Sequence, residues 1–479
     1  MSLNENNKLS KKEDLFNPLR NIWNEIPYKN ISTFNDLNKI LNENKVITNG
    51  FNNNINMGFF HSITQYNNMN LCISIGMNKK DSFDFYTQKL KNNYSLYGMK
   101  SFTFSYNMII KILYQLLYFQ NIYFNNQQEL KNYIQENLTY LCNNENISIN
   151  VLILVSKKSI LHNINEINKN SYSIIMPSDI NEKYMMCGLF FCDNSIKILE
   201  KQNIDKFMEF HDSRERFAKY ENYIRNNVPI NERHKFMINS SVVLYTLGAR
   251  ESNDLDLYIH KIPETLANHI IKEKTDGELK FLDIKIKNTS LWPSHWDIWL
   301  DEWAQLSKAK YFEEIIANDE FHYYFLGLKI TSLETDIARR LVRLRPAAIA
   351  DLIILKECFN LNINIPTIPE KQNIYKKIDD LNEESILFYQ NNNTLYNEKT
   401  REFILEKEIN INKFQNTVTH YLKTRYNYDT QFRINNSYCN KSLSFSSVRK
   451  LEKTNEKKDI VNNSDKKMVK IRINNIKKI

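Results

Sequence analysis

The sequence predicts a mixed α/β fold of the α+β kind, spread over more than one domain. The chain has 479 residues, more than one ordinary hydrophobic core supports. Hydrophobic residues make up 42% and aromatic residues 12% of the chain, which is enough to build such cores. Short runs rich in β-branched and aromatic residues also alternate with longer segments of helical period. These observations exclude a chain that is disordered throughout.

Composition also excludes several classes of protein. No apolar run approaches the roughly 18 residues of a membrane span, so we expect no membrane partner. The polar first segment, 1–14, has no signal-peptide core. The six cysteines lack zinc-site spacing and predict buried free thiols in an intracellular, cytoplasmic protein. Only 8 glycines and 9 prolines occur beside abundant Asn, Lys and Ile, which is typical of an AT-rich genome such as that of a large DNA virus or a protist.

The net charge of +9 is concentrated at the C-terminal end. Segment 441–479 holds twelve Lys/Arg and four Asp/Glu, a net of +8, which leaves about +1 for the other residues. Its polar composition predicts a disordered basic tail over 431–479. Such a tail either binds RNA by neutralising phosphates or is simply solvated.

The first half of the chain divides into a polar leader, 1–30, and an α/β domain over 31–205. Strands are predicted over 68–77, 101–106, 148–155 and 187–192, and helices over 109–124 and 127–142. A charged amphipathic helix over 203–227 ends before Pro229 and marks the boundary with a second domain, 206–362. No phosphate loop or catalytic pair occurs in 31–205, so the sequence predicts no role for that domain.

Residues suited to metal and phosphate chemistry follow position 240. A predicted strand over 241–247 leads into Gly248, and a second strand is predicted over 254–260. Alternate side chains of a strand share a face, so Asp254 and Asp256 project together. Two carboxylates on one face repel each other unless a cation lies between them, and Mg²⁺ prefers oxygen ligands. The alternative is a surface hairpin with two solvated aspartates.

The short link between the two strands adds to the pattern. Gly248 lets backbone approach a ligand closely, and Arg250 fits phosphate oxygens in a two-pronged contact. With Ala249 between them, and Asp254 and Asp256 beyond, this segment resembles the nucleotidyltransferase superfamily related to DNA polymerase β. The closest likeness is to the compact branch that includes AbiEii-type toxin transferases. Ala249 stands where that family has Ser or Gly.

The resemblance covers about residues 235–360 and implies a function. It implies transfer of a nucleoside monophosphate from an NTP, with ATP the first choice, to an acceptor hydroxyl. In that interpretation Gly248, Ala249 and Arg250 hold the phosphates, while Asp254 and Asp256 bind Mg²⁺ or Mn²⁺. The resemblance does not identify the acceptor, which is an RNA 3′ end, a protein side chain or a small molecule. The alternative function is a catalytically inactive transferase fold that binds RNA or protein.

The family also has a third carboxylate on a later strand. Strands predicted over 279–287 and 294–300 carry Asp283 and Asp297. We prefer Asp297 because apolar residues flank it and its strand comes later; Asp283 is the reserve. The resemblance implies that Asp297 binds the metal or deprotonates the acceptor. The alternative for Asp297 is a capping or ion-paired aspartate.

The following segment is similar to the post-catalytic helices of the same family. A strand is predicted over 323–331, then a helix that carries Arg339 and Arg343, then another helix from 347. Arg339 and Arg343 are four residues apart and share a face, which suits nucleotide phosphates or an ion-paired helix face. We expect Asp351 to pair with one of the arginines of this region.

The remaining chain is predicted to form a helical appendage, 363–430. Segment 367–376 indicates a linker, and helices are predicted over 398–411 and 412–427.

Overall fold

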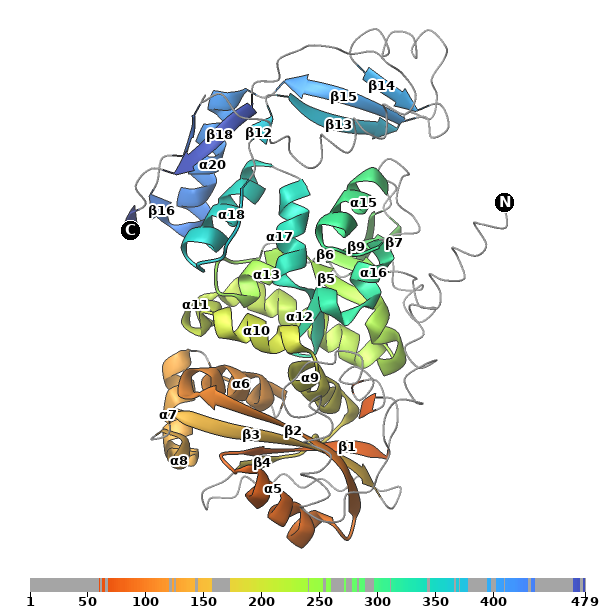
Figure 1. Cartoon of the computed structure of the whole chain (residues 1–479), viewed down its shortest axis with the longest axis vertical. Coiled ribbons are helices and arrows are strands. Elements are labelled where there is room, and N and C mark those ends of the chain that lie inside the picture. The colour runs from red at the N-terminus through yellow and green to blue at the C-terminus, as the bar shows by residue number, and fades with distance from the viewer. Residues whose placement is uncertain are drawn as a thin grey trace, which may run out of the picture. The chain divides into compact units, whose positions relative to one another are not determined.

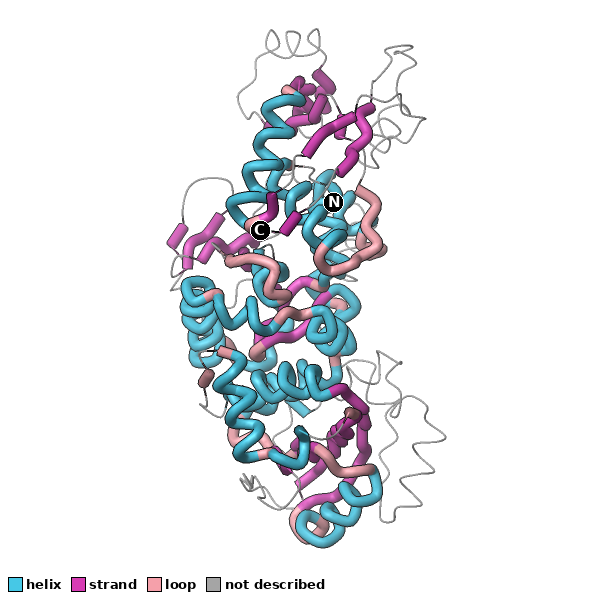
Figure 2. Tube along the Cα trace, turned by 90° about the vertical axis from the view of Figure 1, so that its left-hand side faces the viewer, coloured by secondary structure: helices cyan, strands magenta, loops and turns pink. Residues whose placement is uncertain are grey.

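A computed structural model describes the chain in part. The described residues are 60, 63–64, 68–119, 123–124, 126–142, 145–156, 173–239, 241–252, 256–259, 271–272, 278–281, 284–288, 297–310, 312–342, 345–365, 368–369, 371–377, 394–397, 402–408, 410–429, 432–435, 468–473 and 477–478. They fall into two compact units. The first is Met1–Lys272, Leu279–Ile286 and Ile315–Leu333; the second is Glu273–Glu278, Lys287–Glu314 and Glu334–Ile479. Helices and strands alternate through the described residues, which form a mixed fold of the α+β kind (Figure 2).

A four-stranded antiparallel sheet opens the first unit (Figure 1). Its strands are β1 (Met69–Ile75), β2 (Tyr94–Ser105), β3 (Asn146–Ser156) and β4 (Ser173–Ile175), in the order β2-β3-β1-β4. The register of β1 on β3 runs from Met69 opposite Val155 to Ile75 opposite Ile149. The strands predicted over 68–77, 101–106 and 148–155 are therefore confirmed, although β2 is longer than expected.

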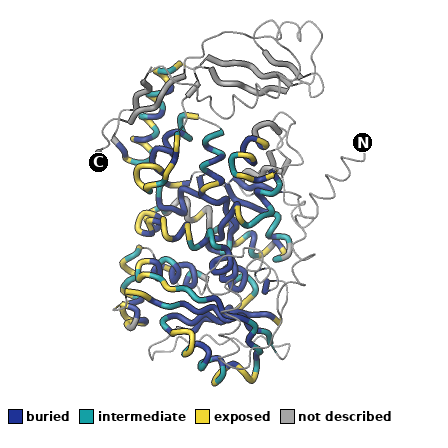
Figure 3. The backbone as a smooth tube through the Cα atoms, viewed as in Figure 1, coloured by how far each residue is buried: buried dark blue, intermediate teal, exposed yellow. Residues whose placement is uncertain are grey.

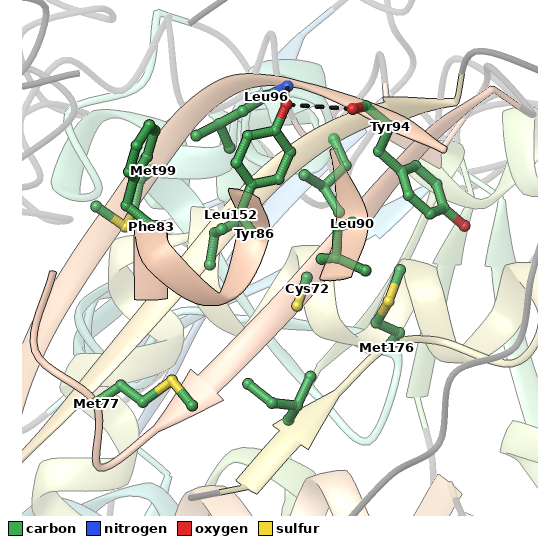
Figure 4. Close-up of a cluster of buried hydrophobic side chains, with 12 residues drawn as sticks. Cys72, Met77, Phe83, Tyr86, Leu90, Tyr94, Leu96, Met99, Leu152 and Met176 are labelled. Atoms are coloured by element: carbon green, nitrogen blue, oxygen red, sulfur yellow. Dashed lines mark hydrogen bonds between the residues drawn. The ribbon is translucent and has the colours of Figure 1, made fainter. Parts of the chain in front are cut away.

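Burial on both faces explains why these strands are continuous apolar runs. Every residue of β1 is buried, as is most of β3 (Figure 3). On one face lie α5 (Lys79–Phe85) and the π-helical turn η1 (Tyr86–Leu90), which close a cluster of buried side chains (Figure 4). The hydroxyl of Tyr86 donates to the carbonyl of Tyr94 at 3.2 Å and accepts from the Leu96 amide at 3.1 Å. The buried phenol is thus satisfied by β2, as a buried polar group requires.

After α5, seven further α-helices are described before the first strand of the second sheet. They are α6 (Tyr106–Phe119), α7 (Gln127–Asn137), α8 (Thr139–Cys142), α9 (Ile180–Phe191), α10 (Asp193–Lys201), α11 (Ile204–Glu209) and α12 (His211–Asn227). The helices predicted over 109–124 and 127–142 are confirmed in their main parts. The strand predicted over 187–192 is wrong, because that segment ends α9. This helix is buried on all sides, so its apolar run lacks the polar stripe that marks a helix. The helix predicted over 203–227 is divided at Phe210.

The first unit also contains most of a seven-stranded mixed sheet. Its strands are β5 (Phe236–Asn239), β6 (Asp256–Ile259), β7 (Ile271–Lys272), β8 (Glu278–Phe281), β9 (Ile284–Asn288), β10 (His322–Phe325) and β11 (Leu328–Thr331), in the order β10-β11-β5-β6-β9-β8-β7. Strand β5 runs antiparallel to β6 and parallel to β11. The single strands predicted over 279–287 and 323–331 are each divided into two. The second break has a physical reason, because Leu326 and Gly327 adopt positive φ and turn the chain.

Buried ionisable groups lie beside β10 and β11. His322 is fully buried, and burial, with the charge of Lys329 as a lesser cause, lowers its pKa to about 4. Its Nδ1 lies 3.1 Å from a carboxylate oxygen of Asp319, and its Nε2 lies 3.0 Å from the Ile316 carbonyl. Burial lowers the pKa of Lys329 to about 8, and its ammonium donates to the carbonyl of His234 at 2.7 Å. These groups therefore carry less charge than exposed ones at neutral pH.

The second unit combines helices with small sheets. Its helices are α15 (Asp297–Leu306), α17 (Leu333–Val342), α18 (Pro346–Glu357) and α20 (Ile411–Tyr426), and α16 (Phe312–Ala317) crosses from it into the first unit. The short strands are β12 (Ile368–Pro369), β13 (Lys371–Lys377), β14 (Thr394–Asn397), β15 (Glu402–Glu408), β16 (Tyr428–Asp429), β17 (Phe432–Asn435), β18 (Met468–Ile473) and β19 (Lys477–Lys478). None of the described helices is long and apolar enough to cross a bilayer.

Several C-terminal predictions are corrected by these strands. The helix predicted over 398–411 is wrong, because β15 pairs with β13 on one side and with β14 on the other. The linker predicted over 367–376 contains β12 and most of β13. Part of the tail predicted to be disordered is ordered, since β18 pairs with β17. The helix predicted over 412–427 is confirmed as α20. The boundary predicted near 205 falls inside the first unit, and the predicted domain limits stay predictions.

Candidate functional site

The strand that carries Asp256, β6, is the central strand of the sheet and pairs with β5. Asp256 begins β6 and is directly opposite Asn239, the last residue of β5. Residues directly opposite in an antiparallel pair project from the same face, so the carboxylate and the amide lie side by side. Asp256 is 7% exposed and Asn239 is 0% exposed. The predicted strand over 254–260 is confirmed from Asp256 to Ile259, while Asp254 lies outside the described residues.

A short helix, not a strand, joins β5 to this site. The strand predicted over 241–247 is wrong, because Ser241–Thr246 form helix α13. All six of its residues are buried, so the segment shows no polar stripe of helical period. The adjacent β-branched residues Val242 and Val243 favour a strand locally, but the packing of the segment in the core favours a helix and outweighs that local preference.

Gly248 ends α13 in a Schellman arrangement. The Ala249 amide donates to the Leu244 carbonyl at 2.9 Å, and the Gly248 amide donates to the Tyr245 carbonyl at 2.9 Å. Gly248 has φ +73°, a conformation that glycine adopts without strain. A Cβ at this position would lie 2.2 Å from the Asn203 carbonyl oxygen. The glycine is therefore required by the helix end and by close packing, and nucleotide contacts of Gly248 and Ala249 stay predictions.

Two serine hydroxyls link the start of α13 to the end of the following loop. The Oγ atoms of Ser241 and Ser252 lie 2.7 Å apart, and both residues are buried. Between them, Arg250 is buried and donates from Nη1 to the Glu251 carbonyl at 3.0 Å. The segment from Ser241 to Ser252 is thus closed by a hydrogen bond between its two ends. A phosphate contact of Arg250 stays a prediction.

The far end of α13 is anchored to neighbouring elements. The side-chain amide of Gln202 donates to the Thr246 carbonyl at 2.8 Å, and the Asn203 amide donates to the Leu247 carbonyl at 2.8 Å. The Thr246 and Tyr323 hydroxyls are also hydrogen-bonded, which connects α13 to β10. These bonds fix the segment that leads from β5 to β6, and a site supported in this way holds its geometry.

The segment that carries the third predicted carboxylate is a helix. Asp297 begins helix α15, so the strand predicted over 294–300 is wrong. Leu300, Trp303 and Ala304 of this helix are buried at i, i+3 and i+4, the spacing of a helix face. The side chain of Asp297 and the whole of Asp283 lie outside the described residues. Within the described ranges, no three His, Cys, Asp or Glu residues form a group able to hold a metal ion.

The arginines of α17 have carboxylate partners within the second unit. Arg339 donates from Nε and Nη2 to Oδ1 of Asp336, at 3.1 and 2.9 Å, and Arg340 donates to Oδ2 of Asp336 at 2.8 Å. Arg340 also pairs with Asp351, whose other oxygen accepts from Tyr426. The predicted pairing of Asp351 with an arginine is confirmed.

Arg339 and Arg343 are the two arginines that the sequence predicts to contact nucleotide phosphates. The Arg339 side chain is 16% exposed and takes part in the ion-paired helix face that was the alternative. Arg343 lies outside the described residues. A nucleotide contact of either arginine stays a prediction.

Sequence reasoning missed three polar residues of this site: Asn239, Ser241 and Ser252. A signal was present, because polar residues over 239–241 interrupt the apolar run from 236 to 247. We interpreted 241–247 as a strand, whereas β5 ends at Asn239 and helix α13 covers Ser241–Thr246. The sequence matches no known family model, and no curated protein or solved structure is significantly similar to the chain.

Proposed function

We propose that this protein is a metal-dependent nucleotidyltransferase, which moves a nucleoside monophosphate from an NTP, with ATP the first choice, to an acceptor hydroxyl. The observation that carries the proposal is the buried pairing of Asp256 with Asn239 across β5 and β6. The D-x-D spacing adds Asp254 to the same face of that strand in the sequence pattern.

The donor set fits a hard divalent cation. Asp256 offers carboxylate oxygens, and the buried amide of Asn239 has neither its oxygen nor its nitrogen hydrogen-bonded within the described ranges. Mg²⁺ and Mn²⁺ take oxygen ligands of these two kinds. A bound divalent cation would neutralise phosphate charge and orient the reacting oxygens. Asp254 and Asp256 would hold it, and Asp297 remains the proposed base for the acceptor hydroxyl.

The other residues of the loop position these groups. The Ser241–Ser252 hydroxyl pair and the Schellman end at Gly248 hold the segment from Ser241 to Ser252 in one conformation, and we propose that this segment supports Asp256. Arg250, within the same loop, is proposed to stabilise the triphosphate charge. Fixed groups of this kind lower a reaction barrier by orientation and by electrostatic stabilisation.

The acceptor we favour is an RNA 3′ end, because the basic segment 441–479 suits phosphate binding. The test is transfer of label from α-³²P-labelled ATP, in Mg²⁺ or Mn²⁺, to bulk RNA or to bulk protein. We expect label in RNA, and a loss of at least about 100-fold in the double variant Asp254→Ala, Asp256→Ala. Asp205→Ala, an exposed aspartate of α11, is the matched control and should keep full activity.

The outcomes separate the two candidate functions. Label in protein instead of RNA would keep the transferase and change the acceptor class. No label in either pool, together with no binding of ATP, would refute the proposal. That result would favour the inactive transferase fold as a binding module, an alternative supported by Ala249 in place of the family's Ser or Gly.

A further inference from the structure

We infer that Asn239 is a ligand-facing residue of this site, whose side-chain carbonyl supplies a neutral oxygen to the divalent cation held by Asp256. The inference rests on the proposed function and deepens it. It assigns an oxygen ligand of the cation to β5, whereas the family resemblance implies a third carboxylate from a later strand, Asp297 or Asp283.

The first step of the argument is the state of the Asn239 amide. The residue is fully buried, and within the described ranges neither Nδ2 nor Oδ1 has a hydrogen-bond partner. Buried side-chain amides are nearly always hydrogen-bonded, because leaving one unpaired costs free energy. An apolar residue at this position of β5 would avoid that cost. The amide is therefore explained by a group that binds there and supplies the missing partner.

The second step is direction. Asn239 is opposite Asp256 in the β5–β6 register, so both side chains project from one face of the sheet. The next pair along, Ile238 and Leu257, is buried and projects from the opposite face. The unpaired amide is thus directed to the side of the sheet that carries the carboxylate.

The third step is the chemistry of the missing partner. A carboxylate oxygen and an amide oxygen side by side form a chelating pair for a hard cation. Asparagine adds an oxygen without adding charge, so the metal-free site avoids a further carboxylate beside Asp256. Asn70 of β1 gives a comparison: it is also buried, and its Nδ2 has no partner within the described ranges, but its Oδ1 accepts from the Leu71 amide at 2.9 Å. The difference between the two residues is therefore the side-chain oxygen, which is hydrogen-bonded in Asn70 and without a partner within the described ranges in Asn239.

The test is Mn²⁺ binding to the full chain, followed by the EPR signal of free Mn²⁺, with and without α,β-methylene-ATP. Asn239→Val should weaken Mn²⁺ binding about tenfold or more, since even indirect support of a metal ligand contributes that much. Its melting temperature without metal should equal or exceed that of the wild type, because an unpaired buried amide is removed. Asn239→Asp should melt lower without metal and bind Mn²⁺ at least as tightly. Asn70→Val is the matched control and should bind Mn²⁺ like the wild type.

The outcomes distinguish this inference from the proposed function. If Asp254→Ala, Asp256→Ala removes Mn²⁺ binding while Asn239→Val leaves it unchanged, Asn239 is not a ligand and the transferase proposal stands. If Asn239→Val melts lower without metal and binds Mn²⁺ normally, the residue is structural. If the double aspartate variant binds Mn²⁺ like the wild type, both proposals fail together.

Discussion

Replacing Gly248 by alanine tests the packing beneath the candidate site. Gly248 has φ +73°, and alanine in this region costs about 1 kcal/mol. The added Cβ would also lie 2.2 Å from the Asn203 carbonyl oxygen and 3.0 Å from the Phe207 amide nitrogen. Backbone cannot give way as a flexible side chain can, so overpacking adds about 1–3 kcal/mol. We expect Gly248→Ala to lower the free energy of unfolding of the first unit by about 3 kcal/mol.

The assay is urea denaturation followed by circular dichroism, with thermal melting as a second measure. Gly327→Ala provides a comparison, because Gly327 has nearly the same φ, +74°. The decrease in the free energy of unfolding of Gly327→Ala measures the conformational cost of alanine in a hairpin turn. The additional decrease in Gly248→Ala then measures the cost of the close approach to Asn203. A loss below about 1 kcal/mol at Gly248 would show that the end of α13 does not pack on α11 as described.

Three further substitutions have defined outcomes. Arg340→Ala should destabilise the second unit by about 3 kcal/mol or more, because it leaves two buried carboxylates without their shared partner. Arg339→Ala should cost less, about 1 kcal/mol, in the same urea titration, because the Arg339 side chain is partly exposed and Asp336 keeps its ion pair with Arg340. The folded pKa of His322, about 4, lies below its unfolded value of about 6.5, so the stability that its neutral form confers is complete above pH 6.5 and declines as the pH falls towards 4. Between pH 7 and 5, His322→Gln should therefore lose about 2 kcal/mol less than the wild type, and equal losses would contradict a buried neutral histidine. Tyr323→Phe removes the buried hydroxyl bonded to Thr246 and should lower stability by about 1 kcal/mol, and an unchanged stability would show that this hydrogen bond does not stabilise the fold.

Segments whose local pattern agrees with their burial could be predicted from the sequence. β1 and β3 are short apolar runs buried on both faces, and α18 begins at Pro346, a residue that favours the first helical turn. The second half of the D-x-D strand, from Asp256, was predictable because apolar residues alternate with the carboxylates.

Segments whose burial overrides the local pattern could not be predicted. α9 and α13 are helices without a polar stripe, so their apolar runs resemble strands. β15 contains several glutamates, and its helix-like composition is overruled by pairing with β13 and β14. For the same reason the partner of Asp256 was missed: Asn239 becomes its neighbour only through strand pairing.

The parallel pairing of β5 with β11 has a consequence for how the chain is made. Ile238 pairs with Ile330, about ninety residues later in the sequence. At about 5–20 residues per second, a ribosome needs roughly 5–20 s to extend the nascent chain from one strand to the other. During that interval one edge of β5 has unpaired N–H and C=O groups, although its other edge can already pair with β6. We therefore expect nascent chains stalled before β10 to be aggregation-prone and to require a chaperone, while chains extended past β11 are not.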